Sequence, residues 1–215
     1  MKKIICAIPR GRILDDLLPI LESIDIKPED EFFRSNSRKL IFKTNIENFN
    51  IIRVRAFDVA TFVALGAAHI GIAGDDVLNE FKYEEICSVL DLNIGKCRLV
   101  LAKKKDEKKF KDNNYGCITV ATKYKNTVTD FFANKGIRAE CIKLNGAVEI
   151  ASNLGICSYI VDLVSTGKTL LENELVEQET LFNISSKLIV NKIALKVMYI
   201  DLEKYIKKFE ENVNG

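Results

Sequence analysis

Short apolar runs alternate along this chain with stretches in which apolar side chains recur every three or four residues. Runs of about four to eight apolar residues are typical of buried strands, and the longer period places side chains on one face of a helix. Ile13, Leu17 and Leu21, for example, share one helical face directly after the apolar run at residues 2–8. In the first half of the chain the predicted strands are residues 2–8, 49–54, 69–73, 85–92 and 97–103, and the predicted helices are residues 13–24 and 59–65.

The alternation resumes after residue 116, and strands that alternate with helices predict an α/β fold with parallel sheets. Asp58 is well placed to cap the helix at residues 59–65, because its carboxylate can accept from the first N–H groups of a helix. In the second half the predicted strands are residues 116–121, 138–144, 159–164 and 176–184, and the predicted helices are residues 126–134, 147–153 and 201–209.

Two long strand regions, near residues 85–103 and 176–186, are the natural places for the chain to pass between two lobes and return. We therefore expect lobe I at residues 1–92 together with 185–215, and lobe II at residues 93–184. A cleft between two such lobes is a common place for a small ligand.

The composition is that of an ordinary globular protein: 215 residues, 47% of them apolar and 29% charged. The net charge of +2, from 32 basic and 30 acidic residues, gives no argument for a nucleic-acid or membrane partner. No segment approaches the roughly 20 apolar residues that span a bilayer, and the N-terminal apolar run is too short for a signal peptide. We expect a cytoplasmic protein with neither kind of partner.

The six cysteines contain no C-x-x-C pair, and nearly all of them lie within apolar runs. They are typical of buried, reduced thiols in a cytosolic protein. The single histidine, His69, has no cluster of other metal-binding residues near it in the sequence. We therefore expect His69 to be structural, and we expect no protein-held metal.

A hydroxyl-rich turn, Ser165 to Thr169, follows the predicted strand at residues 159–164 and precedes a predicted helix start. Unpaired N–H groups at a helix start attract anions, so this turn is a candidate phosphate cradle. The Walker A loop is excluded, because it needs a glycine five residues before Gly167 and Asp162 stands there. An acid before such a turn suits a ribose 5-phosphate, whose hydroxyls can donate to the carboxylate. The alternative is a helix start that Ser165 or Thr166 caps for stability alone.

Arginines stand at several strand ends of the first lobe. Arg10 and Arg12 follow the first predicted strand, Arg55 follows the strand at residues 49–54, and Arg38 precedes a short apolar segment. Ligands of α/β sheets bind at the carboxyl ends of strands. Cations near a helix start oppose its dipole unless an anion compensates, so these arginines also indicate an anionic ligand.

These motifs, in this order, resemble the short form of the ATP phosphoribosyltransferase family. The resemblance implies an α/β, two-lobed, periplasmic-binding-protein-like fold with mixed, mainly parallel sheets and a cleft between the lobes. It extends from about residue 4 to residue 190, and its matching stretches are residues 7–12, 37–41, 58–63, 71–78, 90–94, 121–124, 142–149 and 160–170.

The reaction implied by the resemblance joins ring nitrogen 1 of the adenine of ATP to the anomeric carbon of phosphoribosyl pyrophosphate, with release of pyrophosphate. It is the first step of histidine biosynthesis and uses substrate-bound Mg²⁺. The resemblance to the short form also implies a catalytic-subunit dimer and a histidyl-tRNA-synthetase-like regulatory subunit in a hetero-octamer, with no histidine-binding domain added to this chain.

The resemblance assigns residues to each substrate. Asp162 and Glu149 would contact the ribose hydroxyls, although Glu149 alone could be an ordinary helix acid. Asp76 would contact ATP, although an acid in a first helical turn also stabilises the helix without a ligand. The family usually has lysine where Arg10 stands. Arg10 keeps the positive charge of that lysine but not its hydrogen-bonding geometry. The 5-phosphate would be held by Ser165, Thr166, Gly167, Lys168 and Thr169, the pyrophosphate and polyphosphate groups by the catalytic residues Arg55, Arg38 and Arg12, and ATP by Arg10, Arg12 and Asp76.

Two other functions are compatible with parts of the pattern. A two-lobed small-anion-binding or sensing protein would share the architecture without catalysis, although no export signal is recognisable. A phosphoribosyltransferase acting on a small base would ordinarily have two adjacent acids before the Thr-Gly turn, and here only Asp162 is present.

Overall fold

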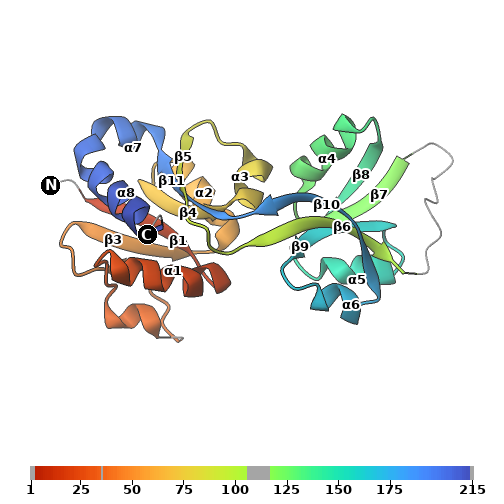
Figure 1. The fold of residues 1–215 in the computed structure, drawn as a ribbon, viewed down its shortest axis with the longest axis horizontal. Coiled ribbons are helices and arrows are strands. Elements are labelled where there is room, and N and C mark those ends of the chain that lie inside the picture. The colour runs from red at the N-terminus through yellow and green to blue at the C-terminus, as the bar shows by residue number, and fades with distance from the viewer. Residues whose placement is uncertain (1–2, 35, 106–116, 214–215) are drawn as a thin grey trace. The chain divides into compact units, whose positions relative to one another are not determined.

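The computed structural model describes residues 3–34, 36–105 and 117–213, which form two compact units with one sheet each (Figure 1). Unit 1 comprises Met1–Gly95 and Ser185–Gly215, and unit 2 comprises Lys96–Ile184. Residues 93–95, which the sequence placed in lobe II, belong to unit 1. The Ser186 N–H donates to the Ile94 carbonyl at 3.0 Å, and the Gly95 N–H donates to the Asp16 carboxylate at 3.0 Å.

The sheet of unit 1 has the strand order β2-β3-β1-β4-β11-β5. The neighbours β3, β1 and β4 are parallel, so their carboxyl ends lie at one edge of the sheet. The strands are β1 (Ile4–Pro9), β2 (Ile41–Lys43), β3 (Phe49–Val54), β4 (Ile70–Gly74), β5 (Ile86–Asp91) and β11 (Ser186–Asn191).

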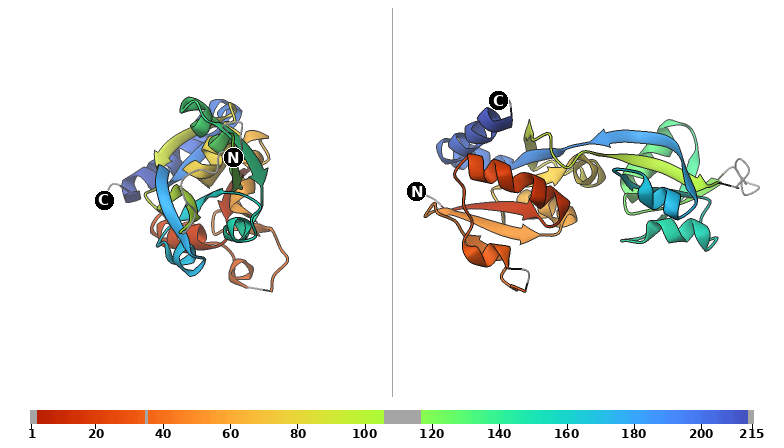
Figure 2. Two further views of the ribbon diagram at one scale, coloured as in Figure 1. Left: turned by 90° about the vertical axis from the view of Figure 1, so that its right-hand side faces the viewer. Right: turned by 60° about the horizontal axis from the view of Figure 1, so that its bottom comes forward.

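Two apolar clusters cover the two faces of this sheet. Successive residues of a strand point to opposite faces. Cys6 and Ile8 therefore pack into one cluster with helices α1 and α8, while Ala7 packs into the other with α2. Figure 2 shows α1 (red) and α8 (dark blue) side by side. The helices of unit 1 are α1 (Arg12–Ser23), the 3-10 helix η1 (Asp30–Phe33), α2 (Ala56–Ala64), α3 (Asp75–Phe81), α7 (Lys192–Val197) and α8 (Tyr199–Val213).

Helix α2 begins three residues before the start that the sequence predicted. Its N-cap is Arg55, whose carbonyl accepts from the Asp58 N–H at 2.9 Å, so Asp58 lies in the first turn and is not the cap. An acid near a helix start is favoured both as a cap and in the first turn, and the sequence alone does not separate the two positions.

The sheet of unit 2 has the order β10-β6-β9-β7-β8, and its core includes Val100, Ala121 and Ile160. Helix α5 packs against this core through Val148 and Ala151. The elements are β6 (Cys97–Lys104), β7 (Cys117–Thr122), α4 (Lys125–Asn134), β8 (Arg138–Lys143), α5 (Val148–Asn153), β9 (Tyr159–Val164), α6 (Lys168–Glu172) and β10 (Leu175–Ile184).

Both sheets are mixed, as predicted. Among the described strands, four pairings are parallel and five are antiparallel. Parallel pairing is confined to β3-β1-β4 and β9-β7-β8, so the predicted majority of parallel pairings holds only for these two groups of three strands. Antiparallel pairing enters through β2, β6, β10 and β11.

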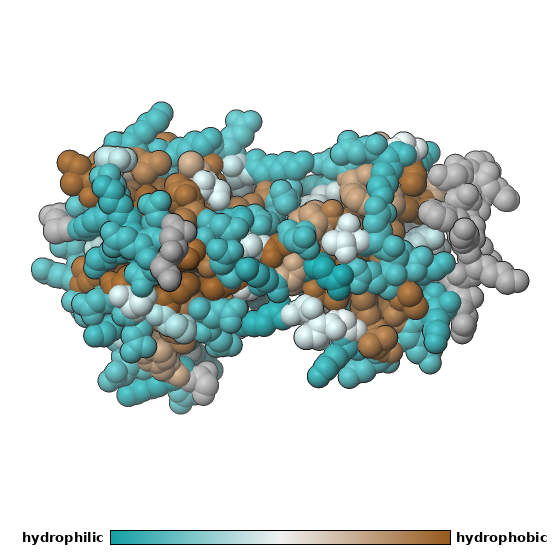
Figure 3. Space-filling model, in the orientation of Figure 1, coloured by the Kyte–Doolittle hydropathy of each residue, from teal (hydrophilic) through white to brown (hydrophobic). Residues whose placement is uncertain are grey.

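The helices in the described part of the chain include none that is both long and apolar enough to cross a bilayer. The surface seen in Figure 3 is largely hydrophilic, with apolar side chains gathered over α7 and α8 at the upper left. The exposed members of this apolar surface are Ile193, Val197, Tyr199 and Ile200.

Candidate functional site

The carboxyl ends of β1 and β3 bring two of the predicted arginines to neighbouring positions. In the parallel register Pro9 lies opposite Val54, and the Arg10 N–H donates to the Val54 carbonyl at 3.0 Å. Arg10 and Arg55 are the next residues of the two strands. Arg12 follows within the same turn as the first residue of α1.

Arg38 approaches this edge from β2, which runs antiparallel to β3. Ile41 lies opposite Ile52, and the Arg53 N–H donates to the Leu40 carbonyl at 3.0 Å. The same register, continued beyond the strand, leads residue 38 toward Arg55. The fold of unit 1 thus brings Arg10, Arg12 and Arg55 to the edge at which β1 and β3 end, and directs the segment of Arg38 toward it.

The guanidinium groups at this edge are exposed and have no counterion among the described residues. Arg34 and Arg98 form ion pairs with carboxylates elsewhere in the chain. In contrast, Arg10, Arg12, Arg38 and Arg55 form no side-chain hydrogen bond or ion pair with residues 3–34, 36–105 or 117–213. Like charges gathered without counterions favour the binding of a polyanion, to which each planar guanidinium can donate two hydrogen bonds.

The helix starts at this edge also leave backbone N–H groups for a ligand. The N-cap of α1 is Gly11, whose φ of 83° and ψ of −152° define a conformation that is essentially restricted to glycine. Among the residues that the structure describes, no side chain caps α1 or α2. Their N-terminal ends carry partial positive charge, which adds to that of the arginines.

Asp76 lies in the first turn of α3, directly after β4, and its side chain is buried with 8% exposure. Because β4 is parallel to β1, Asp76 reaches the same sheet edge as the arginines. Asp75, which the sequence analysis did not include in the site, accepts from the Ser185 N–H at 3.1 Å and pairs with Lys187 at 3.3 Å. Asp75 therefore has a structural role in unit 1.

The predicted phosphate cradle lies in unit 2 between β9 and α6. The N-cap of α6 is Gly167, with a positive φ of 79°, and no side chain of the described residues caps the helix. This excludes the alternative in which Ser165 or Thr166 caps α6. In the part of the chain that the structure describes, the N–H groups from Ser165 to Thr169 donate to no protein acceptor, and the hydroxyls of Ser165, Thr166 and Thr169 have no protein partner. Such a run of unsatisfied donors suits a phosphate group.

Asp162 and Glu149 are positioned by neighbouring elements of unit 2. Asp162 lies in β9 and is half-buried, and its Oδ1 accepts from the Leu163 N–H at 2.8 Å. Helix α5 packs against β9, with Val148 and Ile160 in one apolar cluster. Glu149, half-buried in the first turn of α5, is thereby carried by the helix next to the strand of Asp162.

The candidate residues therefore form two sets, each built within its own unit. Unit 1 carries the arginines and Asp76, and unit 2 carries the carboxylates of Asp162 and Glu149 together with the cradle. Sequence reasoning missed Arg53, whose half-buried side chain lies near the arginines of unit 1. Strand alternation was the available signal, because Arg53 shares a face of β3 with the buried residues Phe49 and Ile51.

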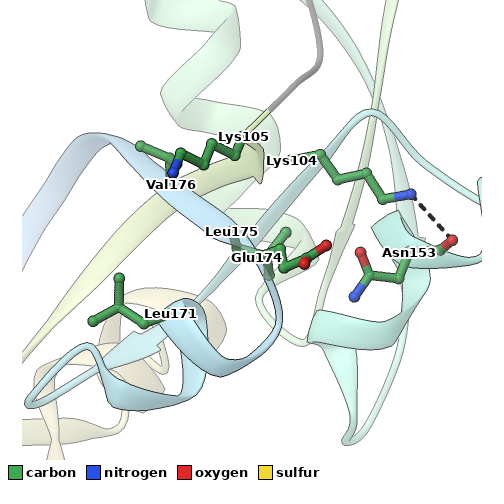
Figure 4. A pocket seen from close by; sticks show the side chains of 7 residues that line it. All are labelled: Lys104, Lys105, Asn153, Leu171, Glu174, Leu175 and Val176. Atoms are coloured by element: carbon green, nitrogen blue, oxygen red, sulfur yellow. Dashed lines mark hydrogen bonds between the residues drawn. The ribbon is translucent and has the colours of Figure 1, made fainter.

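A cavity of about 950 Å³ in unit 2 contains none of the candidate residues. It is lined near the C-terminal end of α6 by Leu171 and Glu174, and on its other side Lys104 donates to the Asn153 carbonyl at 3.2 Å (Figure 4). The described residues contain no group of three or more His, Cys, Asp and Glu side chains that could hold a metal ion.

Comparison with known proteins identifies the family to which this architecture belongs. Residues 55–214 match the family model HisG, described as ATP phosphoribosyltransferase. The chain belongs to the ATP phosphoribosyltransferase family. An ATP phosphoribosyltransferase of Sphingopyxis alaskensis is 51% identical over 210 residues, which are 98% of this chain and 94% of that protein. One of Paramagnetospirillum magneticum is 48% identical, covering 99% of this chain and 98% of that protein.

Solved structures agree with the family and the fold. A chain of the ATP phosphoribosyl transferase (HisG:HisZ) complex from Thermotoga maritima superposes with a TM-score of 0.84 and 27% identity, covering 98% of both chains. The periplasmic aliphatic sulphonate binding protein SsuA from Escherichia coli shares the fold alone, with a TM-score of 0.58, 9% identity and coverage of 99% of this chain and 73% of that one. The predicted family and the two-lobed, periplasmic-binding-protein-like fold are thus confirmed. The non-catalytic anion-binding protein among these structures resembles the chain in fold alone.

Proposed function

We propose that this ATP phosphoribosyltransferase joins ring nitrogen 1 of the adenine of ATP to the anomeric carbon of phosphoribosyl pyrophosphate, the first step of histidine biosynthesis. The observation that carries this proposal is the run of unsatisfied donors from Ser165 to Thr169, which begins three residues after Asp162, in a chain of this family. A phosphate held next to a carboxylate that accepts from hydroxyls is the chemistry of a ribose 5-phosphate.

The reaction asks little of the protein beyond alignment and charge stabilisation. The bond forms between the lone pair of an unprotonated ring nitrogen and the anomeric carbon, while the bond from that carbon to pyrophosphate breaks and its electron pair leaves with pyrophosphate. No general base is required to generate the nucleophile. Positioning of two reactants and stabilisation of developing negative charge are both large contributions to catalysis.

Unit 2 would hold phosphoribosyl pyrophosphate by its ribose 5-phosphate end. The N–H and hydroxyl groups of Ser165, Thr166 and Thr169, the N–H of Gly167 and the ammonium of Lys168 would bind the 5-phosphate. Asp162 and Glu149 would accept from the ribose hydroxyls and fix the orientation of the ring. The position of Asp162 in β9, the central strand of the sheet, supports this role, because a strand paired on both sides orients the carboxylate.

Unit 1 would bind the other anionic groups. Arg12, Arg38 and Arg55 would contact the pyrophosphate and the triphosphate, and stabilise the charge that accumulates on the leaving group. Arg10 and Asp76 would contribute to the ATP side. We propose that Mg²⁺ arrives bound to pyrophosphate oxygens of the substrate, since it prefers phosphate and water ligands.

We also propose a cytoplasmic enzyme that works as a catalytic dimer with a histidyl-tRNA-synthetase-like regulatory subunit in a hetero-octamer. Six free cysteines support a reducing compartment. The partner is supported by the HisG:HisZ complex of the Thermotoga maritima relative. The exposed apolar side chains of α7 and α8 give unit 1 a surface that a subunit contact would bury.

Binding of phosphoribosyl pyrophosphate to the purified chain, measured by calorimetry with Mg²⁺, tests the substrate site. Asp162→Asn should weaken binding by about tenfold or more, because a hydrogen bond to a charged group contributes about 1.5–3 kcal/mol. Glu140→Gln, which removes an exposed carboxylate of the same unit, is the matched control and should leave binding unchanged.

Competition by ribose 5-phosphate and by inorganic phosphate in the same experiment distinguishes the proposed enzyme from a small-anion-binding protein. The proposed enzyme should prefer ribose 5-phosphate to inorganic phosphate, and Asp162→Asn should remove that preference. Equal binding of both anions by the wild type, together with unchanged affinity in Asp162→Asn, would remove Asp162 from the site and favour a small-anion-binding protein.

A further inference from the structure

Arg53 is a cation in β3 to which the proposed function assigns no contact with either substrate. Its Nη1 donates to the Phe32 carbonyl at 2.5 Å, and its guanidinium carbon lies 5.1 Å from the ring centroids of both Phe32 and Phe42. Both phenylalanines are fully buried. The Nε of Arg53 is buried without a hydrogen-bond partner in the described part of the chain. Arg53 is therefore enclosed by aromatic rings rather than paired with a carboxylate.

The backbone and the side chain of Arg53 fix the two ends of one connection. The side chain binds the Phe32 carbonyl in η1, where the connection begins. The Arg53 N–H binds the Leu40 carbonyl directly before β2, where it ends. Arg38 lies between these two anchors, so one residue holds both ends of the segment that carries it.

Arg53 also interacts electrostatically with Arg10 at the end of β1. Burial first, and then the positive charge of Arg10, lower the pKa of Arg53. The two cations are thus close enough to repel each other in the absence of an anion. A side chain held by a carbonyl and two rings resists this repulsion, because cation–π contacts are strongest where water is excluded.

We propose that Arg53 is a positioning residue that holds Arg38 at the end of β3 next to Arg55, which rests on the proposed function of Arg38. It acts through the connection between η1 and β2 and does not itself touch substrate. The arrangement holds the Arg38 side chain, before substrate binds, where the pyrophosphate group of the substrate would lie, so that less ordering of Arg38 is needed during the reaction.

The test is a double-mutant cycle between Arg53→Met and Arg38→Ala, with steady-state kinetics of phosphoribosyl-ATP formation. Methionine keeps the apolar packing between the rings and cannot donate to the Phe32 carbonyl. Since a misplacement of about 1 Å can cost about 10²-fold in rate, we expect Arg53→Met to lower kcat by up to that factor, with a smaller change in KM. The double variant should be no slower than Arg38→Ala alone.

A control variant and hydrogen exchange test the positioning role of Arg53 further. Arg34→Ala, which removes an exposed arginine from the same connection, should leave kcat unchanged. Hydrogen exchange at residues 36–40 should be faster in Arg53→Met than in the wild type or in Arg38→Ala, and this readout does not depend on activity. Arg53→Lys, which keeps a donor, provides a milder variant if Arg53→Met is poorly folded, and should give a smaller acceleration of exchange.

Multiplicative losses of kcat in the double variant, or unchanged exchange at residues 36–40 in both Arg53 variants, would overturn the positioning role. A wild type that forms no phosphoribosyl-ATP would instead contradict the proposed function, while the exchange measurement would still decide whether Arg53 holds the connection.

Discussion

At the residue scale, the chain separates charges that hold the fold from charges that are left for a ligand. Asp91 and Lys187 represent the first kind, because Lys187 binds both Asp91 and Asp75, and Ser185 also donates to Asp91. His69 belongs with them, since its Nδ1 accepts from the Ile5 N–H at 3.0 Å, as expected of a structural histidine. Arg55 and its neighbours represent the second kind.

Asp91 gives a prediction for the pH dependence of stability. Burial alone would raise the pKa of Asp91, but hydrogen bonds from Lys187, Ser185 and the Asn93 N–H, with the charge of Lys187, lower it to about 2. The unfolded chain, with an ordinary Asp pKa of about 3.9, therefore binds the proton more readily. The stabilisation by ionised Asp91 is present above about pH 4 and is lost as the pH falls toward 2.

Asp91→Asn should accordingly lower the free energy of unfolding at pH 7, and its difference from the wild type should shrink as the pH falls from about 5 to about 2. Denaturant unfolding at several pH values measures this difference. The Asp91 side chain is 43% exposed, so water screens the ion pair and the effect will be modest. Glu47→Gln, an exposed acid of the same unit, is the control, and a pH-independent difference for Asp91→Asn would contradict the assignment.

At the element scale, the close approach of α2 to β4 fixes the position of the N-terminus of α2 in the site. A Cβ added to Gly71 would lie 2.8 Å from Val63 Cγ2, 3.0 Å from Val59 Cγ1 and 3.1 Å from the Ala7 carbonyl. Only glycine lets α2 lie this close to the sheet, and Arg55 is the N-cap of the same helix.

Gly71→Ala should therefore destabilise unit 1 by about 1–3 kcal/mol, the usual cost of overpacking a core. Thermal or denaturant unfolding measures this change. Gly146→Ala is the control, because a Cβ there meets nothing within 4 Å. Equal stability of Gly71→Ala and the wild type would show that α2 can move away from β4 at little cost.

The hydrophobic pattern predicted most elements but not how they pair. The strands at residues 49–54 and 159–164 have the predicted bounds, because their apolar runs are short and end at polar turns. Strand β11 was not predicted as a separate strand. It follows β10 after the single residue Ser185, and the division arises because β10 pairs with β6 whereas β11 pairs with β4 and β5. Strand direction and partner choice depend on tertiary packing, which periodicity does not encode.

At the scale of the whole molecule, the net charge does not indicate an anion-binding site. Acids elsewhere balance the arginines, so the total of +2 gives no sign of the unpaired cations at the end of β1 and β3. The order of the motifs indicated the family before the fold was known, and the comparisons confirm it. Within the described residues, the lack of protein partners for Arg10, Arg12, Arg38 and Arg55 and for the turn from Ser165 to Thr169 depends on the folded chain, and no sequence pattern predicts it.

The central claim is that this chain makes phosphoribosyl-ATP, and turnover tests it most directly. The purified chain, with and without a histidyl-tRNA-synthetase-like subunit, is mixed with ATP, phosphoribosyl pyrophosphate, Mg²⁺ and pyrophosphatase, and the products are analysed by mass spectrometry. We predict an adduct of phosphoribose with the adenine ring of ATP, and a strong loss of it in Arg55→Ala. Absence of the adduct even with the regulatory subunit present would contradict the claim.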